Sequence, residues 1–112
     1  MTVLEQAKKI AGALDDKKAQ NIEILHIESL TTLADYFVIC TATSSTHVST
    51  LAQEVERVMK DAGIVPHHVE GYHAGGWVLV DYASVVVHIF TEDTRAFYSL
   101  ERMWADAKRV EL

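Results

Sequence analysis

The sequence predicts an α/β (α+β) fold, in which helices pack on a mixed five-stranded sheet in the element order αββαβββα. Two observations predict it. Apolar residues recur at helical spacing in three stretches, and short apolar runs rich in β-branched residues lie between those stretches. The chain has 112 residues, of which 49% are hydrophobic and 23% charged, so we expect one domain over residues 1–112.

The first part of the chain shows one helix pattern and two strand patterns. Apolar spacing predicts a helix over residues 3–18, which Thr2 and Glu5 begin as a capping box. Strands are expected over residues 21–27 and 35–41. The second of these runs is apolar without interruption over residues 36–40, which is typical of a strand covered on both faces.

A second amphipathic helix is expected to begin within residues 43–46, which offer several caps, and to end at Gly63. Pro66 follows this helix and precedes a short extended segment over residues 67–72. The apolar stripe of the helix is formed by Val48, Leu51, Ala52, Val55, Val58, Met59 and Ala62.

The last third of the chain predicts a hairpin and a helix. Residues 77–82 and 84–90 are apolar runs joined around Ala83, which favours an antiparallel pair. Asp93 or Thr94 can cap the final helix. The apolar face of this helix carries Phe97, Leu100 and Trp104.

Negative charge is concentrated in the middle of the chain. The net charge is −6, and residues 21–90 hold eight acidic residues against only Arg57 and Lys60. Because Lys and Arg make the phosphate contacts of nucleic-acid-binding proteins, we expect no direct nucleic-acid readout. The segment suits a basic partner protein, and the alternative is that these acids simply keep the domain in solution.

Membrane and disulfide chemistry are not indicated. No apolar stretch approaches the roughly 20 residues of a membrane-spanning helix, and the N-terminus does not resemble a signal peptide. Cys40 is the single cysteine, so no intramolecular disulfide can form and we expect a cytoplasmic location. Its place in an apolar strand predicts a raised thiol pKa and low reactivity, which argues against a cysteine nucleophile.

Residues 43–46 are the one candidate phosphate-binding segment, because they lie between a predicted strand and a helix start. No Lys follows them and no Gly-rich fingerprint is present, so structural capping is favoured. We also find no pair of acids on one strand face that would hold magnesium. A small nucleotidyl- or phosphotransfer enzyme that uses Thr43–Thr46 remains the alternative function.

Metal binding is a weak hypothesis. His67, His68 and His73 flank one short segment, but structural zinc takes four ligands and commonly several cysteines. We expect no metal, no cofactor and no catalytic residue.

Aromatic residues interleaved with acids offer a surface for protein binding. Alternation over residues 77–82 places Trp77, Leu79 and Asp81 on one strand face. Val78, Val80 and Tyr82 lie on the other face. Tyr and Trp dominate interface hot spots, but the same residues could equally fill a core between sheet and helices.

Several blocks of the chain, in register, resemble the bacterial ribosomal silencing factors related to plant Iojap. They cover most of residues 5–110. The blocks are Ala34-Asp35-Tyr36-Phe37-Val38-Ile39, Thr43-Ser44-Ser45-Thr46-His47-Val48, Val69-Glu70-Gly71, Gly76-Trp77-Val78-Leu79-Val80-Asp81-Tyr82, Val85-Val86-Val87-His88-Ile89-Phe90 and Phe97-Tyr98-Ser99-Leu100-Glu101-Arg102-Met103-Trp104-Ala105-Asp106-Ala107.

The resemblance implies a non-enzymatic factor that binds ribosomal protein uL14 on the large subunit. It would block joining to the small subunit sterically and so repress translation when nutrients are limiting. The implied fold is similar to a nucleotidyltransferase core without its catalytic acids. The same aromatic face also allows a homodimer when the protein is free. We expect the residues that contact uL14 to be Glu70, Trp77, Asp81, Tyr82, Tyr98 and Trp104.

The chain departs from the pattern of this family at the predicted hairpin turn, where Ala83-Ser84 replaces the usual Gly-Asp. Alanine tolerates positive φ poorly. We therefore expect the hairpin to close through a different turn or a longer loop.

Overall fold

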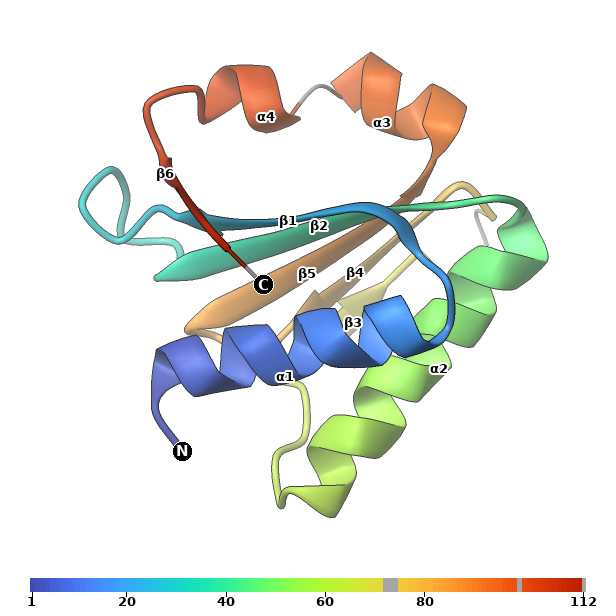
Figure 1. Ribbon diagram of the computed structural model, residues 1–112, viewed down its shortest axis with the longest axis horizontal. Helices are drawn as coiled ribbons and strands as arrows, with labels where there is room; N and C mark the ends of the chain where they lie inside the picture. The colour runs from blue at the N-terminus through green and yellow to red at the C-terminus, as the bar shows by residue number, and fades with distance from the viewer. Residues whose placement is uncertain (72–74, 99, 112) are drawn as a thin grey trace.

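The protein is described from a computed structural model that covers the backbone of residues 1–71, 75–98 and 100–111, and the side chains of these residues apart from 97–101. A central sheet separates two helical layers, with α1 and α2 on one face and α3 and α4 on the other (Figure 1). The helices are α1 (Val3–Asp16), α2 (Ser45–Asp61), α3 (Glu92–Tyr98) and α4 (Leu100–Met103). The strands are β1 (Gln20–His26), β2 (Tyr36–Ala42), β3 (His68–Glu70), β4 (Trp77–Asp81), β5 (Val85–Thr91) and β6 (Lys108–Val110).

The sheet is mixed, as predicted, with strand order β3-β4-β5-β2-β1-β6. Strands β2 and β5 are parallel, and the other neighbours are antiparallel. The predicted strand that is covered on both faces is β2, in which six of the seven residues are buried. Position at the centre of the sheet explains why its sequence lacks polar alternation.

The larger of two buried apolar clusters lies between the sheet and the layer of α1 and α2, and the smaller one lies on the opposite face. Val38 and Cys40 of β2 and Val87 of β5 point into the larger cluster and are fully buried. Both helices contribute apolar stripes at the spacing that the sequence predicted. Their buried residues are Ala7, Ile10, Ala11, Ala13 and Leu14 of α1, and Val48, Leu51, Ala52, Val55 and Met59 of α2.

The starts of the first two helices are confirmed in atomic detail, whereas the expected caps of the last helix, Asp93 or Thr94, lie inside α3, which begins at Glu92. Thr2 Oγ1 accepts from the Glu5 amide at 3.1 Å, while Glu5 Oε1 accepts from the Thr2 amide at 2.8 Å. Ser44 caps α2 by accepting from the His47 amide at 3.1 Å. Both helices end within two residues of the expected positions.

The sheet has six strands rather than the five predicted. Strand β6 pairs antiparallel with β1, with Val110 opposite Ile24. Strand β6 is only three residues long and starts with two charged residues. It therefore has no apolar run that would predict a strand from the sequence. A partner strand that is distant in the sequence therefore decides its conformation.

The last helix predicted from the sequence corresponds to α3 and α4, which lie on either side of residue 99, outside the described residues. Helix α3 begins at Glu92, directly after β5, and α4 ends at Met103. Trp104 therefore follows the helix instead of lying on its face. Of the three residues expected on its apolar face, Trp104 is half-buried, and the side chains of Phe97 and Leu100 lie outside the described residues.

The hairpin of β4 and β5 closes as expected, through a tight turn. The Tyr82 amide donates to the Val85 carbonyl at 2.9 Å, and Asp81 Oδ1 accepts from the Ala83 amide at 2.7 Å. Ala83 has φ of 68°, so the chain retains a left-handed conformation with a residue that disfavours it. In the portion of the chain that is described, the helices are too short or too polar to cross a bilayer.

Candidate functional site

The outer strands β3 and β4 carry exposed acidic and aromatic side chains on the sheet face opposite α1 and α2. Cross-strand pairing places His68 opposite Asp81 and Glu70 opposite Leu79, so their side chains share this face. Trp77 lies on the same face by alternation. We call Glu70, Trp77, Leu79 and Asp81 the acidic-aromatic face.

Exposure on this face is graded from the sheet edge inward. The Glu70 side chain is 60% exposed and that of His68 is 56% exposed, and the two form an ion pair at 2.9 Å when His68 is protonated. Trp77, Leu79 and Asp81 are half-buried. A partner can therefore contact apolar and charged groups together, which is the composition of interface hot spots.

The ring of Trp77 is held against the rings of β5. Its centroid lies 5.7 Å from Phe90 and 6.1 Å from His88, with the ring planes 10° and 9° from parallel. The indole Nε1 donates to His88 Nδ1 over 3.4 Å, a long hydrogen bond. Trp77 is thus a half-exposed residue whose ring orientation is set by contacts with His88 and Phe90 of β5.

His88 is itself a buried polar group, only 5% exposed. Burial lowers the pKa of its imidazole from 6.5 to about 4, because the charged form loses its hydration. An indole can only donate, so Nδ1 is the acceptor and the proton lies on Nε2. That Nε2 has no hydrogen-bond partner among the described residues, a burial that costs on the order of 1–3 kcal/mol.

Trp104 lies further along the same side of the sheet. Its ring meets Phe37 of β2 edge-on, at 5.7 Å and 88°, and Phe37 in turn meets His88 edge-on at 4.8 Å. Trp104 is half-buried and packs on the cluster beneath α3 and α4. Ring contacts through Phe37 and His88 connect it to Trp77.

One of the predicted contact residues lies on the opposite face, and the side chain of another is outside the described residues. Tyr82 is 5% exposed and belongs to the core under α1 and α2, as the alternation of β4 requires. Burial raises the pKa of its phenol. The prediction that Tyr82 is presented to a partner conflicts with this position. Tyr98 lies in α3, and its side chain is outside the described residues.

The six contact residues predicted from the sequence leave out three residues of this region. Leu79 could have been included, since alternation already places it between Trp77 and Asp81. His68 joins the face through its pairing with Asp81, and His88 lies beneath it. Only the strand register, which the sequence does not specify, identifies these two.

The segment Thr43–Thr46 uses its polar groups for local structure. The Thr43 amide donates to His47 Nδ1 at 2.9 Å, and His47 Nε2 donates to the Lys17 carbonyl at 2.8 Å. These bonds tie the start of α2 to the end of α1. They favour the capping interpretation over phosphate binding.

A hollow of about 350 Å³ opens at the carboxyl ends of the parallel strands β2 and β5, the usual ligand position in α/β sheets. Its lining includes Thr41 and Thr43, together with Glu92 and Asp93. The two carboxylates would repel a phosphate. This hollow therefore gives no support to phosphate transfer.

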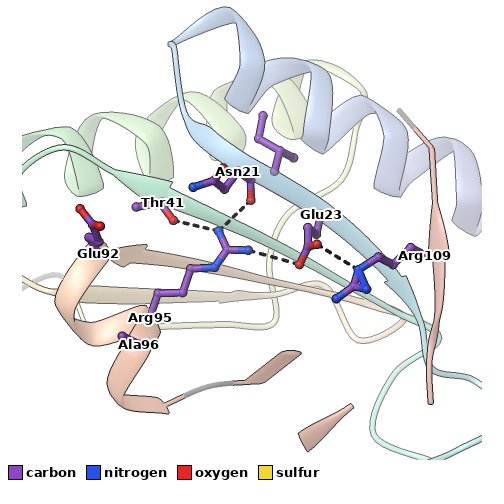
Figure 2. Close-up of a pocket in the computed structure, with 8 residues that line it drawn as sticks. Asn21, Glu23, Thr41, Glu92, Arg95, Ala96 and Arg109 are labelled. Carbon is purple, nitrogen blue, oxygen red and sulfur yellow. Dashed lines mark hydrogen bonds and ion pairs between the residues drawn. The ribbon is translucent and has the colours of Figure 1, made fainter. Parts of the chain in front are cut away.

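A second and larger hollow, of about 650 Å³, lies between β1, β2, β6 and α3 (Figure 2). Arg95, whose side chain is 15% exposed, donates to the Asn21 carbonyl at 2.7 Å and to Thr41 Oγ1 at 2.8 Å. Glu23 bridges Arg95 and Arg109, at 3.3 Å and 2.9 Å. The network joins three strands to α3, which makes it a structural clamp.

Cysteine and metal chemistry receive no support. Cys40 is buried, and burial raises its thiol pKa to about 12, as its place in an apolar strand predicted. Among the described residues, no three His, Cys, Asp or Glu side chains gather in a way that could hold a metal ion. His67 and His68 are exposed, and His73 lies outside the described residues.

The family model of the ribosomal silencing factor during starvation, RsfS, matches residues 1–112. The chain belongs to this family. A ribosomal silencing factor RsfS from Halalkalibacterium halodurans is 40% identical over 112 residues, covering 100% of this chain and 96% of that protein. One from Bacillus subtilis is 41% identical over 105 residues, covering 94% and 89%. Membership assigns the chain to regulators of translation that associate with ribosomes.

The similarity extends to solved structures and to organelles. A crystal structure of a protein from Chromobacterium violaceum matches with a TM-score of 0.91 and 35% identity, covering 94% of this chain and 88% of that one. The chloroplastic protein Iojap of Zea mays is 32% identical over 114 residues, covering 97% of this chain and 47% of that protein. The predicted resemblance and the mixed α/β fold are thereby confirmed.

Proposed function

We propose that the protein binds uL14 on the large ribosomal subunit through the acidic-aromatic face and sterically blocks joining of the small subunit. It would do so in the cytoplasm and repress translation when nutrients are limiting. The observation that carries this proposal is the half-exposed Trp77 on the same sheet face as Glu70 and Asp81, in a chain that belongs to the silencing factor family.

Charge supports a basic protein partner. Glu70 and Asp81 flank Leu79 on the exposed face, and His68 is the group that can offset them when protonated. Complementary charge accelerates encounter with a basic surface and fixes the register of docking. Weakening of the interaction by salt is the expected signature.

Apolar contact supplies the anchor. Trp77 and Leu79 lie side by side on one strand face and are half-buried before any partner binds. A ring already held by Phe90 and His88 loses little conformational entropy on docking. A preorganised aromatic anchor surrounded by charge is the arrangement expected of an interface centre.

Sedimentation tests the proposed function directly. The purified protein is mixed with isolated large subunits, with small subunits, and with both. Co-migration with large subunits and loss of joined ribosomes are the expected results. Normal joining at saturating protein would refute the proposal, and turnover of an added nucleoside triphosphate would favour the phosphotransfer alternative. Self-association without subunit binding would point to a homodimer instead.

Charge variants locate the interface. Glu70→Lys should weaken binding to large subunits by about tenfold and reduce its salt dependence. Asp16→Lys is the matched control, since it changes net charge equally at an exposed position of α1. Asp81→Asn is preferable to a lysine at this position, because the amide oxygen can still accept from Ala83 in the turn. Equal affinity of Glu70→Lys and the control would remove this face from the interface.

A further inference from the structure

We infer that His88 is a positioning residue for partner binding, whose ring fixes the orientation of the Trp77 indole on the acidic-aromatic face. Its biological role rests on the proposed function, while the geometry can be tested in the free protein. His88 is covered by its neighbours and does not itself meet the partner.

Trp77 needs such a support because it is near the edge of the sheet. Among the described residues, only the three-residue strand β3 lies outside β4, so a half-exposed indole there is less enclosed than a ring on a central strand. Parallel contact with His88 and Phe90 sets the plane of the ring, and the bond to His88 Nδ1 sets its direction within that plane. The two contacts together leave one orientation.

If packing were the only requirement at this position, histidine would lower the stability of the fold without a benefit. Phenylalanine would fill a similar volume without burying an unsatisfied Nε2–H. What histidine adds is one acceptor atom, and that atom faces the indole of Trp77. A buried polar group that lowers stability while serving one neighbour indicates a positional requirement.

The support of His88 continues away from Trp77. Phe37 meets the His88 ring edge-on, with the planes 72° apart, and Trp104 packs edge-on against Phe37. Ile39 and Leu79 lie directly opposite His88 on the neighbouring strands. Neighbours on three sides therefore hold the imidazole in one orientation. The fixed imidazole in turn orients the Trp77 indole.

This arrangement also specifies how Trp77 contacts its partner. The indole N–H is directed inward to His88, so the partner meets the apolar part of the ring. The recognised group would be an aliphatic or cationic side chain, with Glu70 and Asp81 alongside.

The chain has two tryptophans, so the test uses a Trp104→Phe background in which only Trp77 remains. In this background His88→Phe removes the acceptor and keeps a ring, while His88→Asn restores an acceptor near the place of Nδ1. His26→Phe is the matched control, because His26 stacks on Tyr36 at the far end of the sheet. The readouts are the indole ¹H–¹⁵N resonance of Trp77, thermal unfolding, and affinity for purified large subunits.

His88→Phe should shift the Trp77 indole resonance and weaken binding about tenfold, without a lower melting temperature. His88→Asn should restore most of the resonance position and most of the affinity. A purely structural role of His88 would not predict this rescue. An unchanged resonance and affinity in His88→Phe would overturn the inference.

Two further outcomes keep the test decisive. If the unsubstituted chain binds no large subunits, the proposed function fails, while the indole resonance still decides the positioning role. If His88→Phe does not fold, hydrogen exchange of the Trp77 indole in the unsubstituted chain decides. Protection supports the bond to His88, and exchange at the rate of a free indole refutes it.

Discussion

The two faces of the sheet are built from the same strands but differ in chemistry. The face under α1 and α2 is filled by aliphatic side chains, together with Cys40 and Tyr82. The opposite face buries a smaller apolar cluster together with His88 and Thr41, carries the Arg95 clamp, and leaves Trp77 and Leu79 half-exposed. The first face is suited to stability and the second to recognition, because polar groups and incomplete burial weaken a core but provide specific contacts.

A matched pair of leucine truncations should separate the two faces most clearly. Leu51→Ala, at a fully buried position of α2, should lower the free energy of unfolding by about 3 kcal/mol. Leu79→Ala, at a half-buried position, should lower it by only about 1 kcal/mol. Urea unfolding measures both. Similar losses would contradict the division into a structural and a recognition face.

Acid should affect the recognition face through His88. Its pKa is about 4 in the fold against 6.5 when unfolded, so between these values the unfolded state binds more protons. Stability should therefore fall as pH is lowered from about 6.5, with a loss of about 2 kcal/mol at pH 5. His88→Phe should remove this part of the pH dependence. Urea midpoints at pH 7 and pH 5, compared between the two chains, measure the effect.

Arg95 should contribute more to the free energy of unfolding than Arg109, which shares Glu23 with it. Arg95→Met should lower the free energy of unfolding by about 1.5 kcal/mol, because it removes the donor to the buried Thr41 hydroxyl and the bond to the exposed Asn21 carbonyl. Arg109→Met, whose side chain is 57% exposed, should cost no more than about 0.5 kcal/mol. Denaturant unfolding of the two variants makes the comparison, and equal effects would argue against the clamp.

A substitution in the hairpin turn should have the smallest effect on stability, and this effect should be a gain instead of a loss. Ala83 adopts φ of 68°, which glycine reaches without strain. Ala83→Gly should raise the free energy of unfolding by about 0.5–1 kcal/mol after the flexibility of glycine in the unfolded chain is subtracted. Partner binding should be unchanged, since both faces keep their side chains. A loss of stability would show that the turn differs from the one described.

Patterns carried by consecutive residues were predictable. The capping box of Thr2 and Glu5, the stripe of α2 and the buried strand β2 all follow from local spacing and were confirmed. Alternation along β4 also assigned Trp77 and Tyr82 to opposite faces correctly. The exposure of those faces was not predictable, because either could have been the one covered by the larger helices.

The sequence by itself determined the elements, the mixed sheet, the acidic middle segment and the resemblance to the silencing factors. These depend on local periodicity, composition and ordered motifs, which need no knowledge of distant contacts. Only the tertiary structure decided that β6 joins the sheet, that Tyr82 is core, and that His88 lies beneath Trp77. Each of these depends on which strands become neighbours, and strand pairing is set by burial across the whole sheet rather than by adjacent residues.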